Sequence, residues 1–459
     1  MKLTDSSLPV LVAGAGLSGT GAARLLLSQG YRVILFDEKP SLDEAKIRCD
    51  CGCTDDRLTI VCGALPETVI RRVRYCVISP GIPLDKPFVQ TLESAGVAVV
   101  SEIELACCFA RGKLAAITGT NGKTTTTSLL GHILREAFPS VFVVGNIGCA
   151  FTGEAPKPTP GSVTVAELSS FQLETLHDFS PSVTAILNIT PDHLNRHKTM
   201  ERYADAKKNI CAGQGPEGFC VLNREDPLLS DVPERTRAKV LWFSSRREQE
   251  EGAFLRGEQL VVRLKGRESV LCTADELHIV GRHNLENAMA AVLMAYCLDV
   301  PEEKIRQGLL SFRAVEHRIE YVLSSGGVTY YNDSKGTNPD AAVQAVLAMK
   351  GPILLIAGGY DKKADFTGWL LALRGRVKKL LLLGDTADQI EAGALRLQAA
   401  PVQRVASLEE AVREAVRQAG PGDCVLLSPA CASWDMFTCY EERGRLFKEY
   451  VRKETCCRA

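Results

Sequence analysis

Short apolar runs alternate with helical stretches along most of the chain, and this alternation constrains the fold more than any other feature. The first example is the run 8–13, followed by a small-residue helix from about Ser18 and a second strand over 31–37. Strands that alternate with helices form mostly parallel sheets, because each crossover helix packs on a sheet face. We therefore expect an α/β fold.

The alternation falls into three blocks. A chain of 459 residues is also long for a single core, at roughly 150 residues per domain. The sequence predicts three α/β domains, at residues 1–102, 103–313 and 314–459. Further strands are expected at 73–78, 97–100, 113–118, 141–144, 163–166, 183–188, 319–323, 328–332, 353–356, 379–383 and 424–427.

Composition excludes several classes of protein. Hydrophobic residues make up 46% and charged residues 24%, which is typical of a globular chain, and the net charge of -1 provides no field to recruit nucleic acid. The chain contains no apolar run long enough to span a membrane, and the polar start at residues 1–7 does not resemble a signal peptide. We expect a cytoplasmic protein without nucleic-acid or membrane partners.

The chain has 17 cysteines, scattered through predicted strands and helices. This distribution favours reduced, buried thiols over a disulfide framework. Cys49, Cys51 and Cys53 could bind a metal, but their spacing matches no paired zinc pattern, so incidental thiols are the favoured interpretation.

A glycine motif, Gly14-x-Gly16-x-x-Gly19, lies between the first strand and the first helix, and Asp37 ends the second strand. This spacing is typical of a dinucleotide-binding turn, in which a pyrophosphate lies close to the amides at a helix start. The same glycines also suit another nucleotide, or close packing of strand and helix. Alone, the motif would suggest NAD.

A second glycine loop, from Thr118 to Thr124, follows a strand and precedes a helical stretch over 125–137. Its backbone amides would cradle a polyphosphate, Lys123 would reach the terminal oxygens, and the Thr124 hydroxyl would face Mg²⁺. The full consensus has a further glycine where this chain has Ile117, so the match is partial. The strand-loop-helix context favours phosphate binding over a chance turn.

Polar residues follow the next two strands of this block: Glu167 after 163–166, and Asp192-His193 after 183–188. Carboxyl ends of parallel strands share one edge, where a carboxylate and an imidazole could hold a divalent ion. His193 could equally be a capping histidine. Lys207, in the helical stretch 200–210, has no special spacing. In Ser428–Ser433 we interpret Cys431 as a small buried thiol rather than a nucleophile.

Taken together, these motifs resemble the Mur ligase family over essentially the whole chain. The family-wide positions are Thr118–Thr126, Asp192-His193, Gly281–Asn287, His317-Arg318 and Asp333–Lys335. The branch that adds D-glutamate is favoured by Ser79–Ile82, Glu167–Glu174, Lys362–Phe366, Ser428–Ser433 and Arg443-Gly444. The resemblance implies Rossmann-like first and third domains around a central P-loop ATPase-type domain.

The resemblance also implies an activity: ATP-dependent ligation of D-glutamate to UDP-N-acetylmuramoyl-L-alanine in peptidoglycan precursor synthesis. The acceptor carboxylate would become an acyl phosphate, and the amine would attack it to give a tetrahedral intermediate. Cations must offset the repulsion between negative reactants, so two Mg²⁺ ions and Lys123 are expected. We expect a monomer.

Residue roles follow from the same resemblance. The catalytic set is Lys123, His193 and Lys207, of which the family carbamylates the lysine at position 207. The metal set is Thr124, Glu167, His193 and Lys207. The ATP set is Gly119, Thr120, Asn121, Gly122, Lys123, Thr124, Thr125, Asn284, Asn287, Arg318, Asp333 and Lys335.

Substrate positions follow as well. For D-glutamate they are Thr337, Lys362, Ser433 and Tyr440, which offer hydroxyls and a cation suited to a dicarboxylate. For the UDP-sugar they are Leu17, Ser18, Asp37, Gly81 and Asn146. The chain departs from the common family residues at Asn195, Gly336 and Tyr440, which bears on substrate contacts rather than on the reaction class.

Three other functions compete. An NAD-dependent oxidoreductase would explain Gly14 to Asp37 but not the Lys123 loop. A P-loop switch or motor would hydrolyse ATP without an amino acid. A sibling ligase would add a different amino acid.

Overall fold

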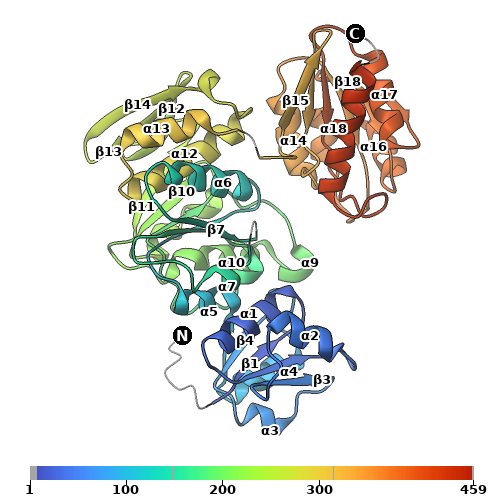
Figure 1. Ribbon diagram of the computed structural model, residues 1–459. Coiled ribbons are helices and arrows are strands. Elements are labelled where there is room, and N and C mark those ends of the chain that lie inside the picture. The colour runs from blue at the N-terminus through green and yellow to red at the C-terminus, as the bar shows by residue number, and fades with distance from the viewer. Residues whose placement is uncertain (1–7, 147–148, 314, 457–459) are drawn as a thin grey trace. The chain divides into compact units, whose positions relative to one another are not determined.

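The computed structural model describes residues 8–146, 149–313 and 315–456, so the polar start at residues 1–7 lies outside it. Its three sheets are covered by helices (Figure 1). The expected α/β class and its three-sheet organisation are confirmed. The chain divides into two compact units, Met1–Thr273 with Glu286–Leu309, and Ala274–Leu285 with Leu310–Ala459. The domain boundaries near residues 102 and 313 stay predictions.

The first sheet is parallel throughout, with strand order β3-β2-β1-β4-β5. Its strands are β1 (Val10–Ala13), β2 (Val33–Asp37), β3 (Leu58–Cys62), β4 (Tyr75–Ile78) and β5 (Ala98–Ser101). Its helices are α1 (Leu17–Ser28), α2 (Glu44–Cys51), α3 (Glu67–Ile70), α4 (Pro87–Ser94) and α5 (Glu102–Phe109). The apolar run at β1 is buried at every position, as expected of a strand covered on both faces.

The central sheet has nine strands, in the order β14-β13-β12-β11-β10-β9-β6-β8-β7. The strands are β6 (Lys113–Thr118), β7 (Val141–Gly145), β8 (Val163–Glu167), β9 (Val183–Ile186), β10 (Phe219–Asn223), β11 (Lys239–Ser244), β12 (Gly252–Arg256), β13 (Gln259–Leu264) and β14 (Arg267–Thr273). The helices are α6 (Lys123–Arg135), α7 (Phe151–Glu154), α8 (Ser170–Leu173), α9 (Leu194–His197), α10 (Met200–Ala212), α11 (Val232–Arg235), α12 (Arg282–Cys297) and α13 (Glu302–Ser311).

The edge of this sheet differs from the expected parallel alternation. β13 runs antiparallel to both β12 and β14, through short turns at Gly257 and Gly266, which both have positive φ. Hairpins of this kind need no crossover helix, so the alternation of strands and helices did not reveal them.

The third sheet has the order β15-β16-β20-β17-β18-β19 and is parallel apart from the pair β15 and β16. Its strands are β15 (Glu320–Ser325), β16 (Val328–Asn332), β17 (Ile353–Ala357), β18 (Val377–Leu382), β19 (Val402–Arg404) and β20 (Cys424–Leu427). Its helices are α14 (Pro339–Ala348), α15 (Thr367–Ala372), α16 (Ala387–Leu397), α17 (Leu408–Gln418) and α18 (Tyr440–Cys456).

One apolar core continues from the first sheet into the central sheet. It includes Leu26 of α1, Leu105 of α5 and Phe151 of α7, all buried, together with strand residues such as Val12 and Ala166. Continuous burial of this kind explains why the first two sheets form one compact unit. Within the described residues, no helix combines the length and the apolarity needed to cross a membrane.

Candidate functional site

The strand order of the central sheet brings the predicted site residues to one edge. β6 lies between β8 and β9 and runs parallel to both. The loop after β6, Glu167 at the end of β8 and the segment after β9 therefore meet at the carboxyl edge. Thr120 N donates to Asn188 O at 2.8 Å, and Asn121 N donates to the Asn188 side chain at 2.8 Å, so the segment after β9 holds the loop.

The loop between β6 and α6 needs its glycines. Gly122 has φ +87°, a conformation that L side chains rarely adopt. A Cβ atom at Gly122 would lie 2.2 Å from Asn287 Oδ1. Asn287 therefore packs directly against the loop at Gly122, where only glycine fits.

Two lysine amines converge on the same carbonyl oxygen of this loop. Lys123 Nζ and Lys207 Nζ each donate to Gly119 O at 2.8 Å. Lys207 is only 2% exposed, and its burial, reinforced by the nearby Lys123 charge, holds its pKa well below the ordinary value. Adjacent cations repel each other, so the arrangement favours an anion between them, or a neutral amine at Lys207.

The end of β8 supplies a carboxylate suited to a metal ion. Glu167 is 1% exposed; its Oε1 accepts a hydrogen bond from Asn146 Nδ2 at 3.1 Å, whereas its Oε2 is buried with no hydrogen-bond partner. A buried carboxylate oxygen without a partner is costly unless a cation or ligand completes it. Thr124 is buried at the start of α6, where the phosphate loop ends. The residues present therefore fit a divalent ion beside a polyphosphate.

His193 precedes α9 in a left-handed conformation, φ +53°. Its Nε2 lies 3.6 Å from Asp192 Oδ2, and its ring packs edge-on against Phe171 with centroids 5.0 Å apart. The side chain remains half exposed, so the imidazole is available to a ligand.

A cavity of about 360 Å³ joins Lys123, Lys207 and His193, whereas Glu167 and Thr124 are not among its lining residues. Ser18 and Gly81, predicted for the UDP-sugar, share it with Asn146, so residues from two sheets line one space. The lining residues are Ser18, Pro80, Gly81, Lys123, Gly145, Asn146, Ser169, Ser170, Phe171, Gln172, Asp192, His193, Tyr203 and Lys207.

Two other residues predicted for the UDP-sugar lie outside the lining of this cavity. Leu17 begins α1 and is 92% exposed. The Asp37 carboxylate accepts hydrogen bonds from Ala15 N at 2.9 Å and Lys39 N at 3.0 Å. Asp37 thus fixes the glycine turn of the first sheet.

In the second unit, Asp333 follows β16 and is buried. Its Oδ2 accepts a hydrogen bond from Ser428 Oγ at 2.7 Å, and burial raises its pKa to about 7. Lys335 Nζ lies 5.2 Å from the centre of the Tyr440 ring, and Thr337 N donates to Lys335 O at 2.9 Å. Asp333, Lys335, Thr337 and Tyr440 therefore belong to one local cluster.

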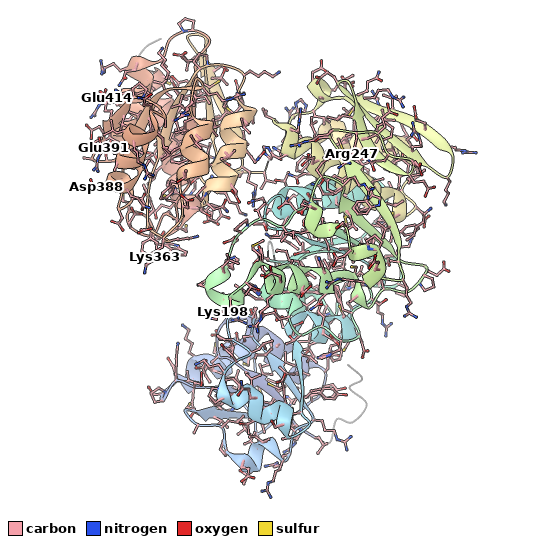
Figure 2. All side chains as sticks on the ribbon, turned by 180° about the vertical axis from the view of Figure 1, so that it is seen from behind. Lys198, Arg247, Lys363, Asp388, Glu391 and Glu414 are labelled. Carbon is pink, nitrogen blue, oxygen red and sulfur yellow. The ribbon has the colours of Figure 1, made fainter. Side chains whose placement is uncertain are left out.

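The remaining predicted cation of the second unit lies on an aromatic surface. Lys362 is exposed, with its Nζ 5.2 Å from the Trp434 ring centre, and Trp434 packs against Tyr360 at 5.6 Å. Ser433, next to Trp434, is 2% exposed. The neighbouring Lys363 extends into solvent at the edge of this unit (Figure 2).

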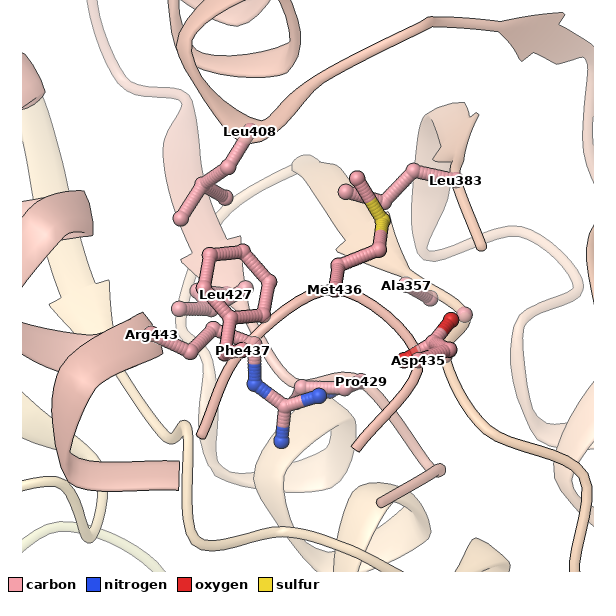
Figure 3. A pocket seen from close by; sticks show the side chains of 11 residues that line it. Ala357, Leu383, Leu408, Leu427, Pro429, Asp435, Met436, Phe437 and Arg443 are labelled. Atoms are coloured by element: carbon pink, nitrogen blue, oxygen red, sulfur yellow. The ribbon is translucent and has the colours of Figure 1, made fainter. Parts of the chain in front are cut away.

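Arg443 of α18 fixes the segment that carries Ser433. Its guanidinium donates to Cys431 O and Ala432 O at 3.2 to 3.3 Å, and burial lowers its pKa to about 10. Figure 3 shows Arg443 reaching from α18 toward Pro429, at a cavity of about 10 Å³ that is large enough for about one water molecule.

Asn284 is also buried in this unit, with its Nδ2 donating to Val280 O at 2.8 Å, and Arg318 follows His317 in a turn after residue 314.

Two residues that the sequence analysis did not single out contribute to the site. Tyr203 lies under Lys207, with the Lys207 Nζ 4.8 Å from its ring centre, and its hydroxyl lies 3.1 Å from Thr120 Oγ1. Tyr203 precedes Lys207 by four residues on α10, a spacing that places both on one helix face and could have signalled the pair. Asn188, which follows β9, has no comparable spacing in the sequence that could have indicated its contact with the phosphate loop.

Two other clusters contain possible metal ligands. Cys51 and Cys53 are buried free thiols. Cys51 donates to Thr20 O and Cys53 donates to Asp55 Oδ1, whereas Cys49 is exposed. Glu316, His317 and Glu320 have ligand atoms close together, but Lys448 Nζ donates to both carboxylates. An ammonium thus occupies the place that a cation would take.

Comparison with known proteins extends over the whole described chain. Family models match at residues 9–101 (Mur ligase MurD-like, N-terminal domain), 117–295 (Mur ligase middle domain) and 317–431 (Mur ligase, glutamate ligase domain). A first-domain match to a Mur ligase replaces the NAD interpretation of the Gly14 turn.

Curated relatives match at nearly full length. The chain is 51% identical to the UDP-N-acetylmuramoylalanine--D-glutamate ligase of Lachnoclostridium phytofermentans, over 96% of this chain and 97% of that protein. It is 47% identical to the enzyme of the same name from Lachnospira eligens, over 96% and 98%. Among solved structures, the MurF ligase from Thermotoga maritima in complex with ADP has a TM-score of 0.59 at 17% identity, covering 100% of this chain and 98% of that chain, which shows a shared fold. From its three matched domains and its close relatives, the chain belongs to the Mur ligase family.

Proposed function

We propose that this protein is the ATP-dependent ligase that joins D-glutamate to UDP-N-acetylmuramoyl-L-alanine. The observation that carries the proposal is the cavity in which Lys123, Lys207 and His193 meet Ser18, Gly81 and Asn146. Phosphate-loop groups and groups at the first sheet thus line one space. The relatives that share 43–51% identity carry the name of this activity.

ATP binding rests on the loop between β6 and α6. Residues 119–125 would surround the phosphates, Lys123 would neutralise their terminal oxygens, and Asn287 beside Gly122 would contact the nucleotide. In the second unit, Asn284, Arg318, Asp333 and Lys335 are the positions that the family resemblance assigns to ATP. The buried Asp333 carboxyl, whose pKa burial raises to about 7, suits hydrogen bonding to ribose hydroxyls.

Mg²⁺ would be held by Thr124 and Glu167, and a second ion by His193. When bound, the ions would neutralise charge on the phosphates and on the acceptor carboxylate. Lys207 is the residue for a carbamate, because its depressed pKa favours the neutral amine that adds to carbon dioxide. As a carbamate, Lys207 would offer anionic oxygens in place of a second cation beside Lys123.

The chain's residues then act on two reactants of like charge. Lys123 holds the phosphoryl oxygens while the acceptor carboxylate becomes an acyl phosphate, and Asn146 positions the pyrophosphate of the UDP-sugar. Thr337, Lys362, Ser433 and Tyr440 would bind D-glutamate so that its amine attacks the acyl carbon and phosphate departs.

An assay of ADP release with the UDP-muramoyl-alanine acceptor tests the proposal. We expect release to require both the acceptor and D-glutamate, with L-alanine and lysine giving none. Release without any amino acid would instead indicate a simple ATPase. Release with a different amino acid would indicate a sibling ligase.

A further inference from the structure

One arginine connects two parts of the first unit. These are the loop at Gly81, which lines the cavity, and the helices of the central sheet. Arg196 of α9 donates through Nη2 to Ile82 O at 2.9 Å and to Glu174 Oε2 at 2.7 Å. Its Nη1 reaches Gly81 O at 3.5 Å. Arg196 and Glu174 are each 15% exposed, so this ion pair is largely shielded from solvent.

Arg196 also contacts the residues that surround His193. Its guanidinium lies 5.0 Å from the centre of the Phe171 ring, the ring against which His193 packs. Glu174 Oε1 lies 3.4 Å from His197 Nδ1, and His197 Nε2 lies 2.9 Å from Ser170 Oγ. Phe171 and Ser170 line the cavity, whereas Arg196 does not.

The contacts continue to the phosphate loop. The His197 ring packs against Tyr203 with centroids 5.1 Å apart, and the Tyr203 hydroxyl lies 3.1 Å from Thr120 Oγ1. Burial lowers the His197 pKa to about 4, so the ring is neutral and adds no charge beside Arg196. One set of packed side chains thus links the Gly81 loop to the loop proposed for ATP.

We propose that Arg196, held by Glu174, is a positioning residue that fixes the Gly81–Ile82 loop in the geometry that binds the nucleotide-sugar substrate. Three acceptors surround the guanidinium, and only a planar fork of five donors can serve them together. A lysine would keep the charge but lose most of this geometry. The inference rests on the proposed function, because it assumes that the loop binds the nucleotide-sugar.

Two variants separate the hydrogen-bond geometry of the Arg196 side chain from its charge. Arg196→Met removes both, and Arg196→Lys keeps the charge alone. We expect each to raise the KM and the calorimetric Kd for UDP-N-acetylmuramoyl-L-alanine about ten-fold, since each loses charge-assisted hydrogen bonds. The KM values for ATP and D-glutamate should stay within about two-fold, because Arg196 donates to no residue of the phosphate loop. Arg202→Met is the matched control, since Arg202 is exposed at a neighbouring hollow that Arg196 also lines.

Unchanged binding of the UDP-sugar in both variants, or an equal loss for all three substrates, would overturn the proposal. Glu174→Gln keeps the side-chain shape and gives the same test if Arg196→Met fails to fold. Amide hydrogen exchange over residues 79–86 provides a readout independent of turnover, and it should accelerate in Arg196→Lys but not in Arg202→Met. If wild-type protein shows no saturable binding of the UDP-sugar, the proposed function fails, whereas the exchange result still decides whether Arg196 holds the loop.

Discussion

The two compact units present their site lysines in opposite ways. In the first unit, Lys207 is 2% exposed and shares the Gly119 carbonyl with Lys123. In the second, Lys362 is exposed over the Trp434 ring, and the acid Asp333 is buried. Burying cations without a matching carboxylate pair is costly, so the first site is prepared for a highly charged anion. The second unit buries the acid Asp333, whose pKa burial raises, and leaves Lys362 at the surface.

Removal of Lys123 tests the charged site of the first unit, and it is expected to have the largest effect. We expect Lys123→Ala to lower ADP formation by about a thousand-fold, because no other group of the loop can replace its charge at the phosphates. Turnover measured by coupled ADP release checks this. Lys113→Ala, at the other end of β6 where Lys113 pairs with Asp299, is the control and should stay near wild type. Near-normal turnover of Lys123→Ala would refute the assignment of the loop.

The loop between β6 and α6 can also be altered at Gly122 without changing any charge. In Gly122→Ala the new Cβ would meet Asn287 Oδ1, and φ +87° would strain the backbone. We expect the KM for ATP to rise about a hundred-fold, with thermal unfolding shifted by only a few degrees. Gly161→Ala serves for comparison, because nothing lies within 4 Å of a Cβ there. An unchanged KM would mean that the phosphates bind elsewhere.

The buried acid of the second unit predicts a pH dependence of stability. The pKa of Asp333 is about 7 in the folded protein, against an ordinary value of 3.8. Folding thus favours the protonated form. The stability that Asp333 contributes is complete below about pH 4 and is lost as the pH rises to about 7.

The size of the effect follows from the same two values. The full pKa difference corresponds to about 4 kcal/mol, and relaxation around a buried carboxyl brings the expected change to about 2 kcal/mol. Denaturant unfolding of wild type and Asp333→Asn across this range measures it. If the unfolding free energies of wild type and Asp333→Asn changed with pH in the same way, Asp333 would be ionised in the folded state.

The exposed lysine should give the smallest effect. We expect Lys362→Ala to raise the KM for D-glutamate about ten-fold with little change in kcat, because it removes a carboxylate partner and leaves the ATP groups intact. Lys363→Ala changes a neighbouring exposed lysine and should leave this KM unaltered. A fall in kcat without a change in KM would point to a role in closing the site instead.

The sequence predicted much of the fold from local pattern. β6, β16 and β20 occur at the expected residues, since a short apolar run beside a glycine turn specifies a buried parallel strand. The hairpins β12 to β14 were not predicted, because their strands follow one another without intervening helices. For the site, Glu167 and His193 could be placed at one sheet edge from the order of strands and motifs. Tyr203 and Arg196 could not, because their roles depend on neighbours brought together by folding.

The sequence by itself determined the phosphate loop and its chemistry, because Gly119, Gly122, Lys123 and Thr124 occupy one continuous turn whose backbone they shape. The residue pattern does not distinguish Lys207 from Lys208, which only the family resemblance separated; the tertiary structure gives the physical reason. Lys207 Nζ reaches Gly119 O across 88 residues of chain, while Lys208 Nζ pairs with Asp231. The helix rotates successive side chains by about 100°, so packing against β6 selects one lysine for burial beside the loop and gives the next an acid partner.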